Sequence, residues 1–213
     1  MRFLALFLFA LPAFAQSFSF GVKGGVPLTD AFSTGRRDPL SYSSVRRRYT
    51  VGPTAEIRLP LLGLSVEVDA LYHRIGWDSS RAGTPVFEPF QSTARIGAWD
   101  FSAPFKRRLG LSDVHPYLAA GPAFRRFFTT RENYVSAASR NLSKQMIDEV
   151  HRKNIAGIVA AAGVELGRAM RIAPEFRYTR WLMNNISDSN PFLSTQANQA
   201  EVLVLVSVTF GGR

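Results

Sequence analysis

Apolar and polar residues alternate along eight segments of this chain, and this alternation is the feature that most restricts its fold. The segments cover residues 17–25, 49–58, 63–76, 93–107, 115–128, 154–167, 170–181 and 200–210. A period of two residues is typical of β-strands with one apolar and one polar face. Segments of about ten residues exceed the ~5–6 residues of ordinary strands and match tilted strands that cross a bilayer. The pattern therefore predicts an all-β chain.

The connections between these segments alternate in length. Residues 26–48, 77–92, 129–153 and 182–199 form long connections, whereas residues 59–62, 108–114 and 168–169 form short ones. All long connections then lie at one end of the sheet. This arrangement predicts an eight-stranded antiparallel up-and-down transmembrane β-barrel, with long loops outside and short turns in the periplasm. Apolar residues at helical spacing in 137–151 indicate a possible short helix in the third long loop.

Alternation alone does not separate a membrane barrel from a soluble one, because only the direction of the apolar face differs. Small residues such as Gly52 and Gly121 on the polar face favour a narrow lumen over a solvent-facing surface. Aromatic residues at both strand ends favour two membrane girdles. They are Tyr49, Tyr72, Trp77, Phe90, Phe127, Tyr178 and Trp181 at one end, and Phe18, Phe20, Phe105 and Phe210 at the other. A secreted soluble sandwich or lipocalin-like barrel is the alternative.

The first fifteen residues predict a secretory signal peptide. Arg2 precedes an apolar run, and Ala13-Phe14-Ala15 supplies small residues for cleavage before Gln16. The alternatives are a membrane anchor or a buried core segment, and the run is shorter than the ~20 apolar residues that span a bilayer. We therefore expect one exported domain over residues 16–213.

Composition narrows the possible chemistry and partners. The chain has no cysteine, which excludes thiolate metal sites, Fe–S clusters and cysteine nucleophiles. Its net charge of +10 is compatible with nucleic acid or an anionic membrane surface, and export argues against nucleic acid. A basic group in or beside the first long loop is suited to lipopolysaccharide phosphates, or alternatively caps the loop in solvent. Its members are Arg36, Arg37, Arg46, Arg47 and Arg48.

Four segments carry a resemblance to a known family. They are Trp99-Asp100-Phe101-Ser102-Ala103-Pro104-Phe105-Lys106, His115-Pro116-Tyr117-Leu118-Ala119-Ala120-Gly121-Pro122, Ala173-Pro174-Glu175-Phe176-Arg177-Tyr178-Thr179-Arg180-Trp181 and Asn198-Gln199-Ala200-Glu201-Val202-Leu203-Val204-Leu205. With them the chain resembles the outer membrane beta-barrel domain proteins of Gram-negative envelopes. The resemblance implies a monomeric outer-membrane barrel, surrounded by lipid and lipopolysaccharide and inserted by the barrel assembly machinery, and it implies no particular activity.

Charged residues of both signs share the parity that faces the predicted lumen. The residues of this predicted network are Glu56, Glu67, Asp69, Asp100, Arg125, Glu165, Glu175, Arg177 and Glu201. Because an unpaired buried charge is costly, we expect them to pair and plug the lumen. The alternative is a pathway for ions or solutes. Arg95 has the opposite parity to Asp100, which predicts a β-bulge between them or a place for Arg95 at the loop margin.

His73 is the best candidate for a catalytic base, because it has inward parity and Ser79 and Ser80 follow it. A lipid A-modifying enzyme would use such groups near the membrane surface. The chain has neither a nucleophile elbow nor a metal-binding motif. We therefore predict no enzyme, no cofactor and no metal. The expected role is structural or interactive with the loops as recognition surface, and a narrow channel is the alternative.

Overall fold

The computed structural model describes residues 18–29, 32–34, 40–44, 48–60, 63–81, 83, 89–109, 114–136, 143–145, 154–183 and 195–211. The predicted signal peptide, and with it the cleavage site, lies outside the described residues. So do Arg36, Arg37, Arg46 and Arg47 of the predicted basic loop.

The regular secondary structure of the described residues consists of β-strands, and no helix among them is long and apolar enough to cross a membrane. The strands are β1 (Phe18–Pro27), β2 (Phe32–Thr34), β3 (Leu40–Ser44), β4 (Tyr49–Arg58), β5 (Leu64–Arg81), β6 (Phe90–Ser102), β7 (Phe105–Arg108), β8 (Val114–Ser136), β9 (Ser143–Gln145), β10 (Asn154–Leu166), β11 (Met170–Trp181), β12 (Thr195–Ala197) and β13 (Ala200–Gly211).

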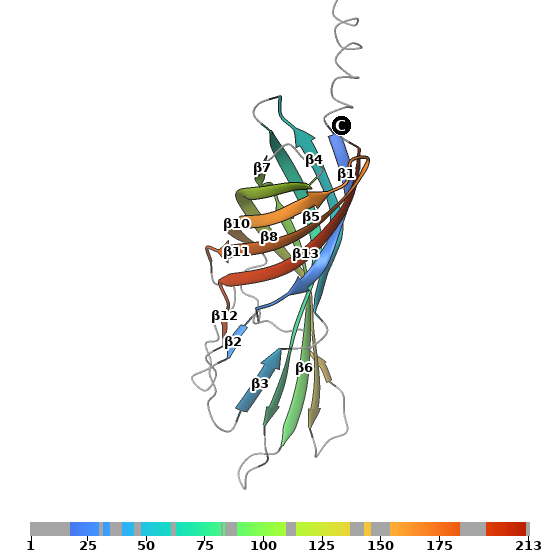
Figure 1. Ribbon diagram of the computed structural model, residues 1–213. Helices are drawn as coiled ribbons and strands as arrows, with labels where there is room; N and C mark the ends of the chain where they lie inside the picture. Colours follow the sequence, from blue (N-terminus) through green and yellow to red (C-terminus); the bar gives the residue numbers. More distant parts are fainter. Residues whose placement is uncertain are drawn as a thin grey trace, which may run out of the picture.

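Eight of these strands close into an antiparallel barrel, which confirms the predicted fold (Figure 1). Their order is β1, β4, β5, β6, β8, β10, β11 and β13, and β13 pairs with β1 to complete the ring. Strand β7 continues β6 and pairs with the same two neighbours. Sequence neighbours among the eight are also neighbours in space, as in an up-and-down barrel. Closure gives the backbone groups of every strand a pairing partner, as the hydrocarbon core of a membrane requires.

Strands β6 and β7 share one position in the barrel wall and are separated by Ala103 and Pro104. Proline has no N–H to donate, yet the ladder is held here because the Ala103 N–H donates to the Pro122 carbonyl at 3.1 Å, and the Glu67 N–H donates to the Pro104 carbonyl at 3.0 Å. Gly121 fits this close approach, since a Cβ at that position would lie 2.6 Å from the Ala103 carbonyl oxygen. The interruption leaves Lys106 facing the lumen.

The register between β6 and β8 shifts between Gly97 and Ala98, where Phe128 is the extra residue of β8. This shift lies beside the segment where the sequence predicts a β-bulge, but the extra residue belongs to β8, so alternation within β6 continues and Arg95 keeps the face opposite to Asp100. Arg95 is exposed on the loop side of the shift, and Asp100 faces the lumen on the other side.

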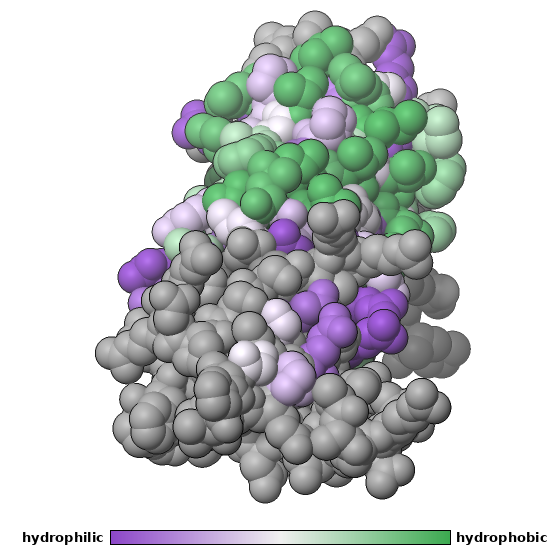
Figure 2. All heavy atoms as spheres, turned by 90° about the horizontal axis from the view of Figure 1, so that it is seen from below, coloured by the Kyte–Doolittle hydropathy of each residue, from purple (hydrophilic) through white to green (hydrophobic). Residues whose placement is uncertain are grey.

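The two faces of the barrel are inverted relative to a soluble protein. Large apolar side chains such as Phe20, Val22 and Phe105 are exposed, whereas charged side chains such as Lys23 and Asp69 are buried. Figure 2 shows hydrophobic residues gathered over a broad region of the described surface, with hydrophilic residues at its margins. A lipid-facing wall requires this arrangement.

The aromatic residues at the strand ends agree only in part with the predicted girdles. At the loop end, the Tyr72 ring contacts the rings of Tyr49, Trp99 and Phe128, with centroids 5.8–6.2 Å apart. At the turn end, Phe18 stacks on Phe20 at 6.4 Å. For two residues of the loop-end girdle, the prediction of an outward direction is wrong. Phe127 and Trp181 are buried in the lumen because they share the inward parity of their strands.

Strands β5, β6 and β8 continue past the barrel as a projecting sheet, visible in the lower half of Figure 1. Strand β3 pairs with the end of β5, and β9 pairs with Glu132–Tyr134 of β8. The helix predicted within residues 137–151 is therefore wrong at Ser143–Gln145. The projecting edge of β8 offers unpaired backbone groups, and pairing with it competes with a local helix. The rest of that segment lies outside the described residues.

A charged lumen as candidate functional site

Alternate residues of the eight barrel strands point inward, and this periodicity places the predicted charges in the lumen. All nine residues of the predicted network lie there. Eight are almost fully buried, and Asp100 is the most exposed, with 17% of its side-chain area accessible. The structure arranges them, with further partners, into three groups along the barrel axis.

The central cluster consists of Lys23, Glu67, Asp69, Glu175 and Arg177. Arg177 donates from Nη2 to Asp69 at 2.6 Å and from Nε to Glu175 at 2.7 Å. The Lys23 ammonium contacts Glu67 and lies 3.1 Å from Glu175 and 3.4 Å from Asp69. Two cations thus hold three carboxylates. Charge-assisted hydrogen bonds of this kind are the strong ones in a low-dielectric interior.

Neutral side chains complete the central cluster. The Tyr117 hydroxyl donates to Glu175 at 2.8 Å, and the Ser102 hydroxyl donates to Asp69 at 3.2 Å. The Tyr117 ring packs against the wall at Gly163, where a Cβ would lie 2.5 Å from the ring. The wall therefore needs glycine there to accommodate this side chain.

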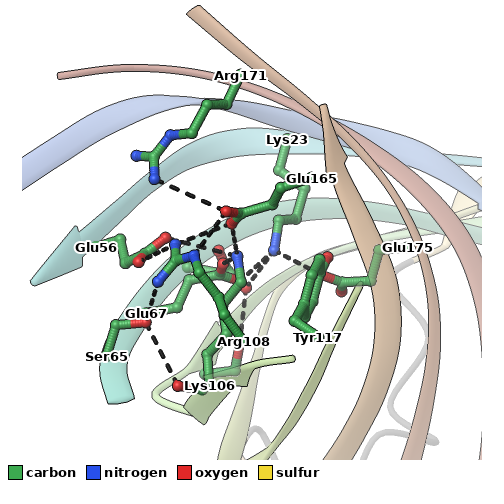
Figure 3. Close-up of polar contacts among 12 residues, drawn as sticks. Lys23, Glu56, Ser65, Glu67, Lys106, Arg108, Tyr117, Glu165, Arg171 and Glu175 are labelled. Atoms are coloured by element: carbon green, nitrogen blue, oxygen red, sulfur yellow. Dashed lines mark hydrogen bonds and ion pairs between the residues drawn. The ribbon is translucent and has the colours of Figure 1, made fainter. Parts of the chain in front are cut away.

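The turn-end cluster consists of Glu56, Lys106, Arg108 and Glu165 (Figure 3). Lys106 Nζ lies 2.5 Å from Glu165, 3.0 Å from Glu67 and 3.5 Å from Glu56. Arg108 donates from Nε to Glu165 at 2.7 Å and also contacts Glu56. Glu67 joins this cluster to the central one, so the ion pairs are continuous across that length of the lumen.

Two participants at this end were missed at the sequence level. Neither Arg108 nor Arg171 is part of the lumen network predicted from the sequence. Arg108 has the same parity as Lys106, and Arg171 has the same parity as Glu175. Extending the inward parity to the last residues of each strand would have found both.

The loop-end cluster consists of His73, Asp100, Arg125, Glu201 and Trp181. Arg125 forms a two-pronged contact with Asp100, at 2.6 Å for each nitrogen, and reaches Glu201 at 2.6 Å. Its guanidinium lies 4.4 Å from the centroid of the Trp181 ring. His73 lies between the carboxylates, with Nδ1 3.4 Å from Asp100 and Nε2 3.1 Å from Glu201.

His73, Asp100 and Glu201 offer potential metal-ligand atoms within 4.8 Å of one another. Arg125 already binds both carboxylates, and a divalent cation among them would face its guanidinium charge. The arrangement is therefore best explained as an ion-paired layer.

The catalytic pairing considered for His73 is not formed. Ser79 and Ser80 lie on the same continuous strand, six and seven residues from His73. At about 3.3 Å per residue, their backbones are roughly 20 Å away from it. A nucleophile must lie within hydrogen-bond reach of its base, so neither serine serves His73 in this structure.

Of the predicted basic loop, the structure describes Arg48 alone. Its Nη1 donates to the Thr29 carbonyl at 2.8 Å, and the Thr29 hydroxyl accepts from the Val202 N–H at 2.9 Å. Arg48 thus ties the end of the first long loop to its beginning at the barrel rim.

A closed antiparallel barrel with an apolar outer wall and an ion-paired lumen is the architecture of outer-membrane barrel proteins. A model of the outer membrane protein beta-barrel domain matches residues 14–187, so the chain belongs to that family. This membership implies location in the outer membrane. No curated protein sequence matches the chain.

One solved structure supports the same fold at low identity, and a second match is weaker. The outer membrane protein OprG from Pseudomonas aeruginosa is 11% identical, with a TM-score of 0.53, and the match covers 92% of this chain and 98% of that chain. The Neisserial surface protein A is 14% identical, with a TM-score of 0.45 and coverage of 91% and 96%.

Proposed function

We propose that this protein is a closed outer-membrane anchor that presents its loop-end sheet for interactions, with no catalytic role. The observation that carries the proposal is the set of three ion-paired clusters that fills the lumen. The turn-end and central clusters share Glu67, and the loop-end cluster follows them toward the other mouth. An eight-stranded barrel has an interior that side chains fill.

The network supports closure through its energetics as well as its size. A conducted ion would have to displace partners that lie 2.5–3.1 Å apart, and each displaced charge would stay in a water-poor interior. Both signs occur in every cluster, so the lumen offers no path lined by one sign of charge. Such a path is what focuses ions in a selective channel.

The projecting sheet supports the interaction role. Strands β5, β6 and β8 carry it beyond the wall, and β3 and β9 add to its edges. A sheet held by a rigid barrel presents a fixed surface at the end that bears the long loops. In this proposal, the basic loop of Arg36, Arg37, Arg46, Arg47 and Arg48 contacts lipopolysaccharide phosphates.

The proposal includes the route to the membrane. Residues 1–15 direct export and are removed, the barrel assembly machinery inserts the chain, and the barrel works as a monomer. The C-terminal strand supports insertion as a single closed unit, because β13 pairs with β1 to complete the ring.

Planar-bilayer conductance of the refolded chain tests closure. Wild type is expected to show little steady conductance. Arg177→Ala removes a guanidinium that binds Asp69 and Glu175, and is expected to raise conductance. Arg180→Ala, on the exposed face of the same strand, is the matched control and should behave as wild type.

A narrow channel is the second candidate. A cavity of about 540 Å³ opens the turn end of the lumen as far as Arg108 and Glu165, which shortens the plugged length. Large, stable, ohmic conductance of pure wild type would overturn closure and establish the channel.

A further inference from the structure

The cavity at the turn end of the lumen is lined by an excess of cations. It lies where the turns after β4 and β10 meet the end of β7, and its volume is about 540 Å³. Its charged or titratable lining residues are Arg58, Arg108, Arg168, Arg171, His115 and Glu165. Four guanidinium groups therefore face one carboxylate.

That carboxylate is already engaged. Glu165 accepts from Arg108 Nε at 2.7 Å and from Arg108 Nη2 at 3.0 Å, and it lies 2.5 Å from Lys106. Glu56, the nearest other carboxylate of the turn-end cluster, also pairs with Arg108 and Lys106. Arg58 and Arg171 thus add positive charge that these two acids do not balance.

Arg171 is buried without full pairing. It is 3% exposed, and its Nε and Nη1 have no hydrogen-bond partner among the described residues. Its Nη1 lies 3.8 Å from Glu165, beyond hydrogen-bond distance, and Nη2 reaches the Gly211 carbonyl at 3.4 Å. Figure 3 shows Arg171 approaching Glu165 from the side opposite Lys106. A buried charged donor left unpaired is costly.

Arg58 repeats this pattern from the other side of the cavity. Its Nε is buried and has no hydrogen-bond partner in the described part of the chain. Arg58 ends β4 and Arg171 lies near the start of β11, so two separate strands deliver unpaired guanidinium donors to one cavity. Independent donors that converge on one space are the mark of an anion site.

We propose that this turn-end cavity binds a phosphate group. A guanidinium matches phosphate in a two-pronged geometry, and a tetrahedral phosphate has enough oxygens for Arg58 and Arg171 together. A single carboxylate offers two oxygens and one charge, which suits this cation excess less well. The phosphate is either inorganic phosphate from the aqueous phase or the headgroup of an anionic lipid beside the turns. Leu59 and Leu64 also line the cavity and are compatible with the second source.

Calorimetric titration of the refolded full chain in an uncharged detergent tests the proposal. One arm uses inorganic phosphate, and the other uses short-chain phosphatidylglycerol, with sodium chloride at matched ionic strength as the blank. We expect saturable binding of at least one probe. Arg171→Gln and Arg58→Gln should each weaken it by about tenfold or more, because each removes a charge-assisted donor.

Arg180→Gln is the matched control, since Arg180 is exposed on the outer face of β11 and donates to Gln199. Heat-modifiable gel mobility identifies the folded barrels, and the Arg58 variant keeps the test decisive if the Arg171 variant does not fold. Saturable binding of phosphate supports a free anion, and binding of the lipid alone supports a headgroup. No saturable binding of either probe, or binding that both variants retain in full, would overturn the site.

Discussion

Removal of Arg177 is the perturbation that probes the lumen most directly. Arg177 is buried and contacts Asp69 at 2.6 Å, Glu175 at 2.7 Å and Glu67 at 3.6 Å. Arg177→Ala would leave Lys23 as the one cation of the central cluster against three carboxylates. Breaking a buried ion pair by removing one partner costs about 3–5 kcal/mol. Water that enters the lumen would relieve part of this cost.

The assay is urea unfolding of the detergent-refolded barrel, followed by tryptophan fluorescence. With an m-value of ~1–3 kcal/mol/M, the full cost of about 3–5 kcal/mol would lower the midpoint by about 1 M or more, and hydration of the carboxylates reduces that shift. Arg180→Ala, on the exposed face of the same strand, should leave the midpoint unchanged. The double variant Arg177→Met with Asp69→Asn should recover part of the loss, because it removes both members of the pair.

A wild-type midpoint for Arg177→Ala, together with a wild-type midpoint for the control, would contradict this interpretation. The carboxylates would then be hydrated in the folded barrel, and the lumen would not be closed by its charges.

Three further outcomes are expected. Val206 faces lipid and pairs with Gly24 and Pro174 on the neighbouring strands. Val206→Arg should therefore destabilise the barrel by about 2–4 kcal/mol if the site is near the midplane. Refolding equal to wild type would show that the assignment of this face to lipid is wrong. Lipid A profiles of cells that express wild type or His73→Ala should match, and a modification lost only in the variant would revive the enzyme hypothesis. N-terminal sequencing of envelope material should give Gln16 as the first residue, and an intact Met1 would contradict cleavage.

Most strand boundaries could be predicted from the sequence. Residues 49–58 and 170–181 were predicted as strands and are β4 and β11. Strands β5 and β8 run further than predicted, to Arg81 and Ser136. Alternation fades in those extensions because lipid no longer dictates an apolar face there, and the strands persist by pairing with β3 and β9.

The alternation also predicted that the charged residues point inward. It was not used to predict the burial of Phe127 and Trp181. Their aromatic character suggested a membrane girdle, but the parity of their strands points both side chains into the lumen. In this barrel, parity outweighed residue type as a guide to direction, because the pleat of a strand fixes where each side chain points.

The barrel and the inward direction of its charged residues followed from the sequence, because a period of two is a local property of the chain. Which charges meet across the lumen depends on the folded barrel. Lys23 on β1 binds Glu67 on β5 and Glu175 on β11, and neither strand is adjacent to β1 in the sheet. These contacts cross the lumen and depend on how the strands are staggered when the ring closes. That stagger is set by all eight strands together, so no single segment encodes it.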